Sequence, residues 1–293
     1  MLEVKEFIFY SNGHNGDIHY SREFIKDILK KLKVKASFEF NSSHKLLKDI
    51  DNLEFKNFNN FNLINEELSY DQNTKKLFIN VWVGSSNAKH IQNEIGCSLT
   101  ANYNKFKNIY NSLNLILENP DFYVPSVNWQ IYDINQVDEF IKNNLFEKYI
   151  LISNGSVLSG QSVNNSLNPV IEVLSNKFKN FAFILTDSKE KINKKNIFYT
   201  TDFIKTNGGD LNEIGYLGTK CDLIIGRGSG PFCFCHNKDC LLDDKKSFLA
   251  ITNYKTDGLW ALPEQLPTKQ AKQFWTNNFD NNSICDIIIK IME

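Results

Sequence analysis

The segment Ser11–Tyr20 combines groups that can take up a proton with glycines that let the backbone approach a ligand. It contains one carboxylate, Asp17, and two imidazoles, His14 and His19. A carboxylate or a neutral imidazole can act as a general base on a hydroxyl group. We therefore interpret Asp17 as the candidate base, with His14 and His19 as the alternatives.

A second glycine-rich segment, Gly226–Pro231 (GRGSGP), has the residue types that hold a diphosphate. Gly228 and Gly230 flank Ser229, and Arg227 stands just before them. Free backbone N–H groups at the start of a helix bind anions, and an arginine adds a charged donor that suits phosphate oxygens. We predict that Arg227, Gly228, Ser229 and Gly230 bind the diphosphate of a donor molecule.

Arginine is rare in a chain that uses lysine freely, and it occurs only at Arg22 and Arg227. Lysine can replace arginine except where a planar, two-pronged donor must grip a phosphate or a carboxylate. We predict that at least one of the two arginines touches an anionic ligand. We also expect a set of residues near Asp17 or after predicted strands to contact the nucleotide or the acceptor: Gly16, Arg22, Asn154, Asp187, Thr201 and Asp202.

Each candidate segment follows an apolar run that is typical of a buried strand, and each precedes residues with helical spacing. Phe7–Tyr10 comes before the Ser11–Tyr20 segment, and Leu223–Ile225 comes before Gly226–Pro231. The sequence therefore predicts two strand–loop–helix units. In open α/β sheets, ligands bind outside the carboxyl ends of the strands, where such loops lie.

Apolar strands alternate with helical segments along most of the chain, which predicts parallel sheets covered on both faces. The alternation restarts near Lys148. We therefore predict an α/β fold of two Rossmann-like, doubly wound domains, residues 1–146 and 147–293, facing each other across a cleft. The last helical segment, Ile284–Ile291, could pack on either domain, including back on the first. The Asn- and Phe-rich segment Leu53–Asn73 gives no clear period.

The overall composition argues against several classes of protein. A net charge of −1 over 293 residues does not suit a general nucleic-acid binder. The sequence shows no run of about 18 apolar residues that could form a transmembrane segment, and its first residues lack the layout of a signal peptide. Six irregularly spaced cysteines indicate reduced thiols and a cytoplasmic location.

Two groups of residues could suggest a metal, and we interpret both otherwise. Cys233, Cys235, His236 and Cys240 lie within FCFCHNKDC, but this spacing lacks the usual C-x2-C pair of a zinc site. The cysteines alternate with phenylalanine, which indicates small buried residues. The adjacent carboxylates of Asp243–Asp244 are not an Asp-x-Asp pair and indicate a solvated turn. We therefore predict no metal site.

Two motifs resemble the ADP-heptose–lipopolysaccharide heptosyltransferases. GDIHYSREFIKDI resembles the first loop and helix of that family, and DLNEIGYLGTKCDLIIGRGSGPF resembles its later helix, strand and phosphate loop. The resemblance implies the GT-B fold, with the acceptor on the N-terminal domain and the nucleotide sugar on the C-terminal domain. It places the family's catalytic Asp at Asp17 and its phosphate loop at Gly228–Gly230. The sequence departs from the family at Gly228, where an Asp is usual, and at Ser153–Asn154, where a basic residue is expected.

These readings together predict an inverting, metal-independent glycosyltransferase of polysaccharide biosynthesis with no bound cofactor. Its partners would be a nucleotide diphosphate sugar and a glycan or glycolipid acceptor, reached in transient visits to a membrane. A nucleotide-sugar hydrolase of the same build is an alternative, because water could replace the acceptor. A non-catalytic nucleotide- or sugar-binding module is another. Neither glycine segment has the G-x-G-x-x-G spacing of a dinucleotide oxidoreductase.

Overall fold

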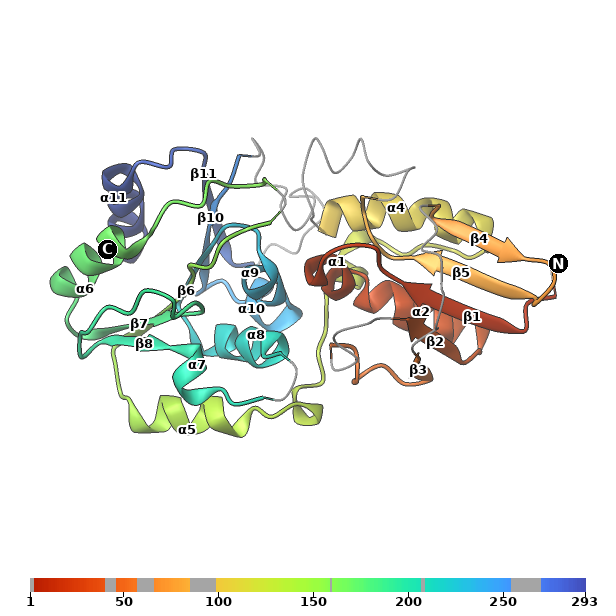
Figure 1. Cartoon of the computed structure of the whole chain (residues 1–293), viewed down its shortest axis with the longest axis horizontal. Coiled ribbons are helices and arrows are strands. Elements are labelled where there is room, and N and C mark those ends of the chain that lie inside the picture. The colour runs from red at the N-terminus through yellow and green to blue at the C-terminus, as the bar shows by residue number, and fades with distance from the viewer. Residues whose placement is uncertain are drawn as a thin grey trace. The chain divides into compact units, whose positions relative to one another are not determined.

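The computed structural model describes residues 3–39, 46–56, 66–84, 99–158, 160–206, 209–253 and 270–293. The chain forms two compact α/β domains; of the described residues, those up to Val127 belong to the first and those from Asn128 onward to the second. Each domain is built on one largely parallel sheet (Figure 1). The predicted α/β class with two parallel-sheet domains is therefore confirmed.

The first domain has a five-stranded sheet in the order β3-β2-β1-β5-β4. Its central strand β1 pairs in parallel with β2 on one side and β5 on the other, and only β4 runs antiparallel. The strands are β1 (Glu6–Tyr10), β2 (Ala36–Glu39), β3 (Leu53–Lys56), β4 (Leu68–Asp71) and β5 (Lys76–Asn80). The segments that follow β1 and β5 consequently leave the sheet at the same edge, side by side.

Stacked aromatic rings join the helices of the first domain. The helices are α1 (Asn15–Tyr20), α2 (Arg22–Leu32), α4 (Leu99–Ser112) and the 3-10 turn η1 (Pro120–Tyr123). Phe24 of α2 lies between Phe106 of α4 and Tyr123 of η1, with ring centroids 4.3 and 4.1 Å apart. All three rings are buried, so these contacts hold α2 and α4 in place beside the candidate base.

The second domain has a six-stranded sheet in the order β11-β10-β9-β6-β7-β8, and all its strands are parallel. The strands are β6 (Lys148–Ser153), β7 (Phe181–Leu185), β8 (Ile197–Tyr199), β9 (Leu223–Gly226), β10 (Ser247–Ile251) and β11 (Lys272–Thr276). The helices are η2 (Trp129–Ile131), α5 (Asn135–Asn143), α6 (Asn168–Lys177), α7 (Thr200–Phe203), α8 (Leu211–Lys220), α9 (Gly230–Phe234), α10 (Lys238–Leu241) and α11 (Asn281–Met292). Every residue of β7 is buried, as expected for a parallel strand covered on both faces.

The last helix, α11, belongs to the second domain. Ile284, Ile288 and Met292 share one apolar core with α6 and with strands β6, β7, β9 and β10, and α11 contacts α6 directly (Figure 1). The suggestion that this helix packs back on the first domain is therefore wrong. The isoleucines of α11 pack against the apolar side chains of α6.

The second domain begins before the strand at which the sequence pattern restarts. Helix α5 packs against α7 and α8: Phe140 stacks on Phe203 with ring centroids 4.0 Å apart, and the Tyr216 hydroxyl donates to Asp138 at 2.9 Å. The structure thus divides the chain at 127/128 rather than at the predicted 146/147. The sequence pattern predicts a short helix at Val137–Leu145, close to α5, but its place before the restart of the pattern assigns it to the first domain.

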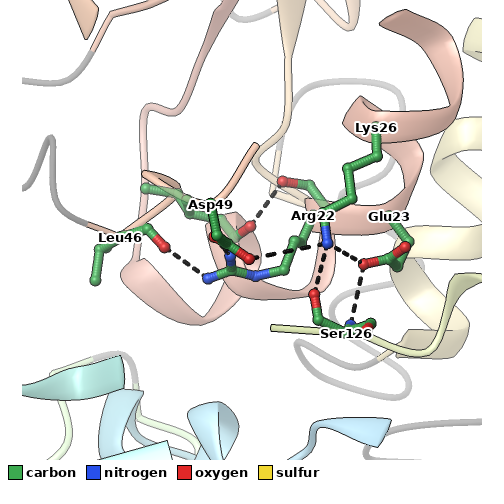
Figure 2. Close-up of polar contacts among 8 residues, drawn as sticks. Arg22, Glu23, Lys26, Leu46, Asp49 and Ser126 are labelled. Atoms are coloured by element: carbon green, nitrogen blue, oxygen red, sulfur yellow. Dashed lines mark hydrogen bonds and ion pairs between the residues drawn. The ribbon is translucent and has the colours of Figure 1, made fainter. Parts of the chain in front are cut away.

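The chain is held on both sides of this division. Figure 2 shows Lys26 and Glu23 of α2 bonded to the backbone of Ser126: the Lys26 ammonium donates to the Ser126 carbonyl at 2.6 Å, and the Ser126 N–H donates to Glu23 at 3.0 Å. In the second domain, the indole N–H of Trp129 donates to Asp239 at 2.6 Å. Only Val127 and Asn128 lie between these two anchors.

Candidate functional site

The Ser11–Tyr20 segment is a loop only as far as His14, because helix α1 begins at Asn15. Gly16, Asp17 and His19 are therefore helical and buried, and the prediction of a loop is wrong for them. The close backbone approach occurs instead at Gly13, where an added Cβ atom would lie 2.2 Å from the Trp82 ring. The loop thus serves to pack β1 against the segment after β5.

The structure separates the three candidate bases. His14 precedes α1 and is exposed, whereas Asp17 and His19 are fully buried. Residues two apart on a helix project to different sides, so Asp17 and His19 do not face each other. The His19 ring lies 5.9 Å from that of Tyr20, centroid to centroid. Asp17 is the candidate that reaches the segment following β5.

Asp17 sits at the sheet edge where β1 and β5 end. Its Oδ1 accepts a long hydrogen bond, 3.4 Å, from the backbone N–H of Val83. The ammonium of Lys105, from α4, donates to the carbonyl of the neighbouring residue Trp82 at 2.8 Å. Lys105 is fully buried, and sequence reasoning missed it: one lysine among many carries no local signal.

Arg22 is not presented to a ligand. It is fully buried, and its guanidinium makes an ion pair with Asp49 and donates to the Leu46 carbonyl at 2.6 Å (Figure 2). Asp49 is equally buried. The structure gives Arg22 a role in fastening the segment around Leu46 and Asp49 to α2, and this is where its two-pronged donor is used.

The second glycine segment has the predicted form. β9 ends at Gly226, Gly228 has a φ of +69°, and α9 begins at Gly230 with a proline in its first turn. The left-handed conformation at Gly228 favours glycine, since other residues pay a steric cost there. β6 and β9 pair so that Ser153 lies opposite Gly226, and the Ser153 and Ser229 hydroxyls are 2.7 Å apart. The carboxyl ends of both strands therefore meet at this loop.

Arg227 is buried inside the loops that follow β6 and β9, where it is 3% exposed. Its guanidinium donates to the carbonyls of Asn154 at 3.2 Å, Gly155 at 3.4 Å and Asn165. Among the described residues, no carboxylate lies within 4.0 Å of it and its Nε has no hydrogen-bond partner. Burial lowers the pKa of Arg227. Asp187 and Glu190 line the same pocket as Arg227, but in the described part of the chain neither forms with it an ion pair like that of Asp49 with Arg22.

A polar pocket of about 160 Å³ opens beside Arg227. Asn154 and Asp187 line it and exchange two hydrogen bonds, of 3.0 and 2.8 Å, each between a side chain and a backbone group. Thr201 and Asp202 are exposed on α7 and do not line this pocket; Asp202 instead pairs with Lys191 at 2.6 Å. The structure thus gathers Arg227, Asn154 and Asp187, and it leaves Thr201 and Asp202 apart.

The cysteine cluster behaves as buried apolar packing. Cys233, Cys235 and Cys240 are buried and carry free thiols, and burial raises the pKa of Cys240 to about 12. In the described part of the chain, no group of histidine, cysteine and carboxylate side chains is arranged to hold a metal ion. Over the same residues, no helix combines the length and the apolarity needed to cross a bilayer.

Comparison with known proteins gives similarity at the level of structure. No family model and no curated protein matches the sequence. The E. coli heptosyltransferase WaaC with ADP superposes with a TM-score of 0.51 at 7% identity over 97% of this chain and 99% of its own. WaaC with ADP-2-deoxy-2-fluoro heptose gives 0.50 at 8% identity over 98% and 99%. The glycosyltransferase TibC from enterotoxigenic E. coli gives 0.52 at 11% identity over 91% of this chain and 63% of its own.

The similarity runs through both domains, since nearly the whole of this chain and of WaaC is matched. At identities this low, the superposition shows a shared fold, and any shared reaction has to be argued from the residues of the site. The two-domain α/β architecture read from the sequence is therefore the architecture of known glycosyltransferases. This chain has the fold of the E. coli heptosyltransferases.

Proposed function

We propose that this protein is an inverting, metal-independent glycosyltransferase that moves a sugar from a nucleotide diphosphate to a hydroxyl group of a glycan or glycolipid. The shared fold supports the reaction class, because the heptosyltransferase WaaC, solved with ADP and with ADP-2-deoxy-2-fluoro heptose, has this fold. In this proposal the first domain supplies the base and the second binds the donor.

The buried guanidinium of Arg227, which no described carboxylate approaches within 4.0 Å, is the observation that supports the donor site. A buried guanidinium is costly unless an anion neutralises it, and three carbonyl contacts supply hydrogen bonds without supplying negative charge. The donor diphosphate would provide that charge from the polar pocket. The N–H groups of Gly228 to Gly230 and the Ser229 hydroxyl would add neutral donors at the end of β9.

Asp17 would act as the base. As the acceptor oxygen bonds to the anomeric carbon, its proton passes to the Asp17 carboxylate, and the bond from that carbon to the diphosphate breaks on the opposite face. The configuration therefore inverts in one step. Arg227 and the loop amides would stabilise the charge that grows on the leaving diphosphate, which is the task that a metal performs in other glycosyltransferases. The proposal requires Asp17 to become accessible when the acceptor binds, since it is fully buried here.

The acceptor class, the role in polysaccharide biosynthesis, the contact with membranes and the cytoplasmic location are parts of the same proposal. The free thiols of the described cysteines suit a reducing compartment. Thr201 and Asp202 would contact the nucleobase or the ribose of the donor if the bound donor extends beyond the pocket beside Arg227. Gly16 and Arg22 would act indirectly, by placing α1.

The first experiment measures thermal stabilisation of the purified protein by ADP, GDP, UDP, CDP and dTDP in a chelating buffer. A nucleotide at about 100 times its dissociation constant adds roughly 2.7 kcal/mol to the stability of the folded state. We expect one nucleotide to stabilise clearly. If none of the five nucleotides stabilises the protein, the proposed donor site is wrong.

The second experiment tests the base with an isosteric variant. We expect Asp17→Asn to lose transfer from the matching nucleotide sugar almost completely, because the amide cannot take up the proton, and to keep the thermal shift by the nucleotide. Transfer that survives in this variant would exclude Asp17. The hydrolase alternative predicts that the wild-type protein releases free sugar when no acceptor is present.

A further inference from the structure

We propose that Lys105 is a positioning residue that keeps Asp17 ionised and oriented, acting through the peptide group between Trp82 and Val83. The inference rests on the proposed role of Asp17 as the base. It concerns a residue on α4 that lies far from Asp17 in the sequence and that neither candidate motif contains.

One peptide group joins the two side chains. Its carbonyl, on Trp82, accepts from the Lys105 ammonium at 2.8 Å, and its N–H, on Val83, donates to the Asp17 carboxylate at 3.4 Å. The C=O and N–H of a trans peptide point in opposite directions, so the ammonium and the carboxylate lie on opposite sides of it. A positive charge on the oxygen side polarises the group and strengthens the bond that its N–H donates.

Burial makes this arrangement consequential. Lys105 and Asp17 are both fully buried, and charges separated by protein rather than by water interact strongly. Burial lowers the pKa of Lys105 to about 8, and the carboxylates of Glu67 and Asp17 act against that lowering. The ammonium is therefore still mainly charged at neutral pH, and the interaction with Asp17 is reciprocal.

A second carboxylate in the described part of the chain also acts on Lys105. Glu67, just before β4, is the other carboxylate that acts on Lys105. Buried titratable groups on the described elements that adjoin α4 include Tyr10 at the end of β1, His19 and Tyr20 on α1, and Tyr123 on η1. Tyr10 stays protonated, because burial raises its pKa. Among the described residues, the ammonium of Lys105 acts on the carboxylates of Glu67 and Asp17, and Asp17 is the one linked to it through the Trp82–Val83 peptide.

A positive charge near a catalytic carboxylate makes it a weaker base but keeps more of it in the ionised form that can accept a proton. A nearby positive charge favours the ionised form of a carboxylate, so Asp17 would be ready to accept a proton over a wider range of pH. The same contact fixes the direction in which the carboxylate oxygens point, because the Val83 N–H holds Oδ1.

The test titrates the Asp17 carboxyl directly by carbon NMR of aspartate-labelled protein, with the Asp17→Asn spectrum identifying its signal. We expect Lys105→Met to move the Asp17 midpoint to higher pH by about one unit or more, and Lys105→Arg to leave it close to the wild-type value. Lys107→Met is the matched control, since Lys107 is exposed on the same helix. An unchanged midpoint in Lys105→Met would overturn the inference and leave a lysine that merely caps the Trp82 carbonyl.

The reciprocal titration covers the case in which Lys105→Met does not fold. In Asp17→Asn, loss of the carboxylate should move the Lys105 midpoint, followed by nitrogen NMR, to lower pH. No movement there would also overturn the inference. Both titrations are independent of turnover, so a protein that transfers no sugar refutes the proposed function without deciding the role of Lys105. Where transfer is seen, the acidic limb of kcat/KM should shift with the Asp17 midpoint in Lys105→Met.

Discussion

At the scale of single residues, the two arginines show what a sequence can and cannot tell. Their rarity led to the prediction that at least one of them contacts an anionic ligand, which stays a prediction, and the segment around Arg227 has the predicted strand, turn and helix start. The partner of Arg22 could not be foreseen, because Asp49 is brought to it by tertiary packing. Lys105 was not predicted as a site residue for the same reason, because no spacing along the chain connects it with Asp17.

His236, between α9 and α10, gives a prediction about acid stability. Its ring lies 4.7 Å from that of Phe232 and 5.1 Å from that of Phe248, centroid to centroid, and burial lowers its pKa from 6.5 to about 3. Between pH 6.5 and about pH 3, His236 binds a proton in the unfolded chain but stays neutral in the folded chain. The free energy of unfolding is therefore highest above pH 6.5 and falls by up to about 1.4 kcal/mol per pH unit down to pH 3 from this group.

Urea unfolding between pH 7 and pH 4 measures this effect as a difference between variants. His236→Phe should lose the part of the slope that belongs to the imidazole, because phenylalanine binds no proton. His14→Phe is the control, since His14 is exposed and should keep the full slope. Equal slopes in all three proteins would contradict the assignment.

At the scale of elements, burial decided which strands the sequence revealed. β9, with all four residues buried, was predicted from the apolar run Leu223–Ile225. β3, β4 and β11 lie at or near sheet edges and are only partly buried, so their sequences show no apolar run. Helix α1 was missed because six residues are too few to display a helical period. Strands could therefore be predicted where they are buried, and helices where they are long enough to show a helical period.

The ion pair between Arg22 and Asp49 should be a main support of the α2 region. Asp49→Asn leaves a buried guanidinium without its counter-charge, and such a loss typically costs about 3–5 kcal/mol. We expect a drop of this order in the free energy of unfolding. Asp51→Asn makes the same chemical change two residues away at an exposed side chain and should cost little. Comparable losses in the two variants would show that the pair is not a support.

At the scale of the whole molecule, the two domains have separate sheets and separate cores. Ile288→Ala removes a side chain that is 2% exposed in the core of the second domain, and truncations of this kind cost about 2–5 kcal/mol. Amide hydrogen exchange should then lose protection in α6, α11 and β10 while β1 keeps its protection. Ile116→Ala, at an isoleucine that is 77% exposed, is the control. Equal loss in β1 would mean that the domains unfold as one unit.

The anchors on either side of Val127 and Asn128 also determine how the protein can be cut. A protease must draw an accessible length of chain into its active site, and buried or hydrogen-bonded backbone resists this. Here Val127 is buried, Ser126 is held by α2, and Trp129 is held by Asp239. Limited proteolysis should therefore leave the chain intact between Ser126 and Trp129, so that a protease does not separate the two domains at this point.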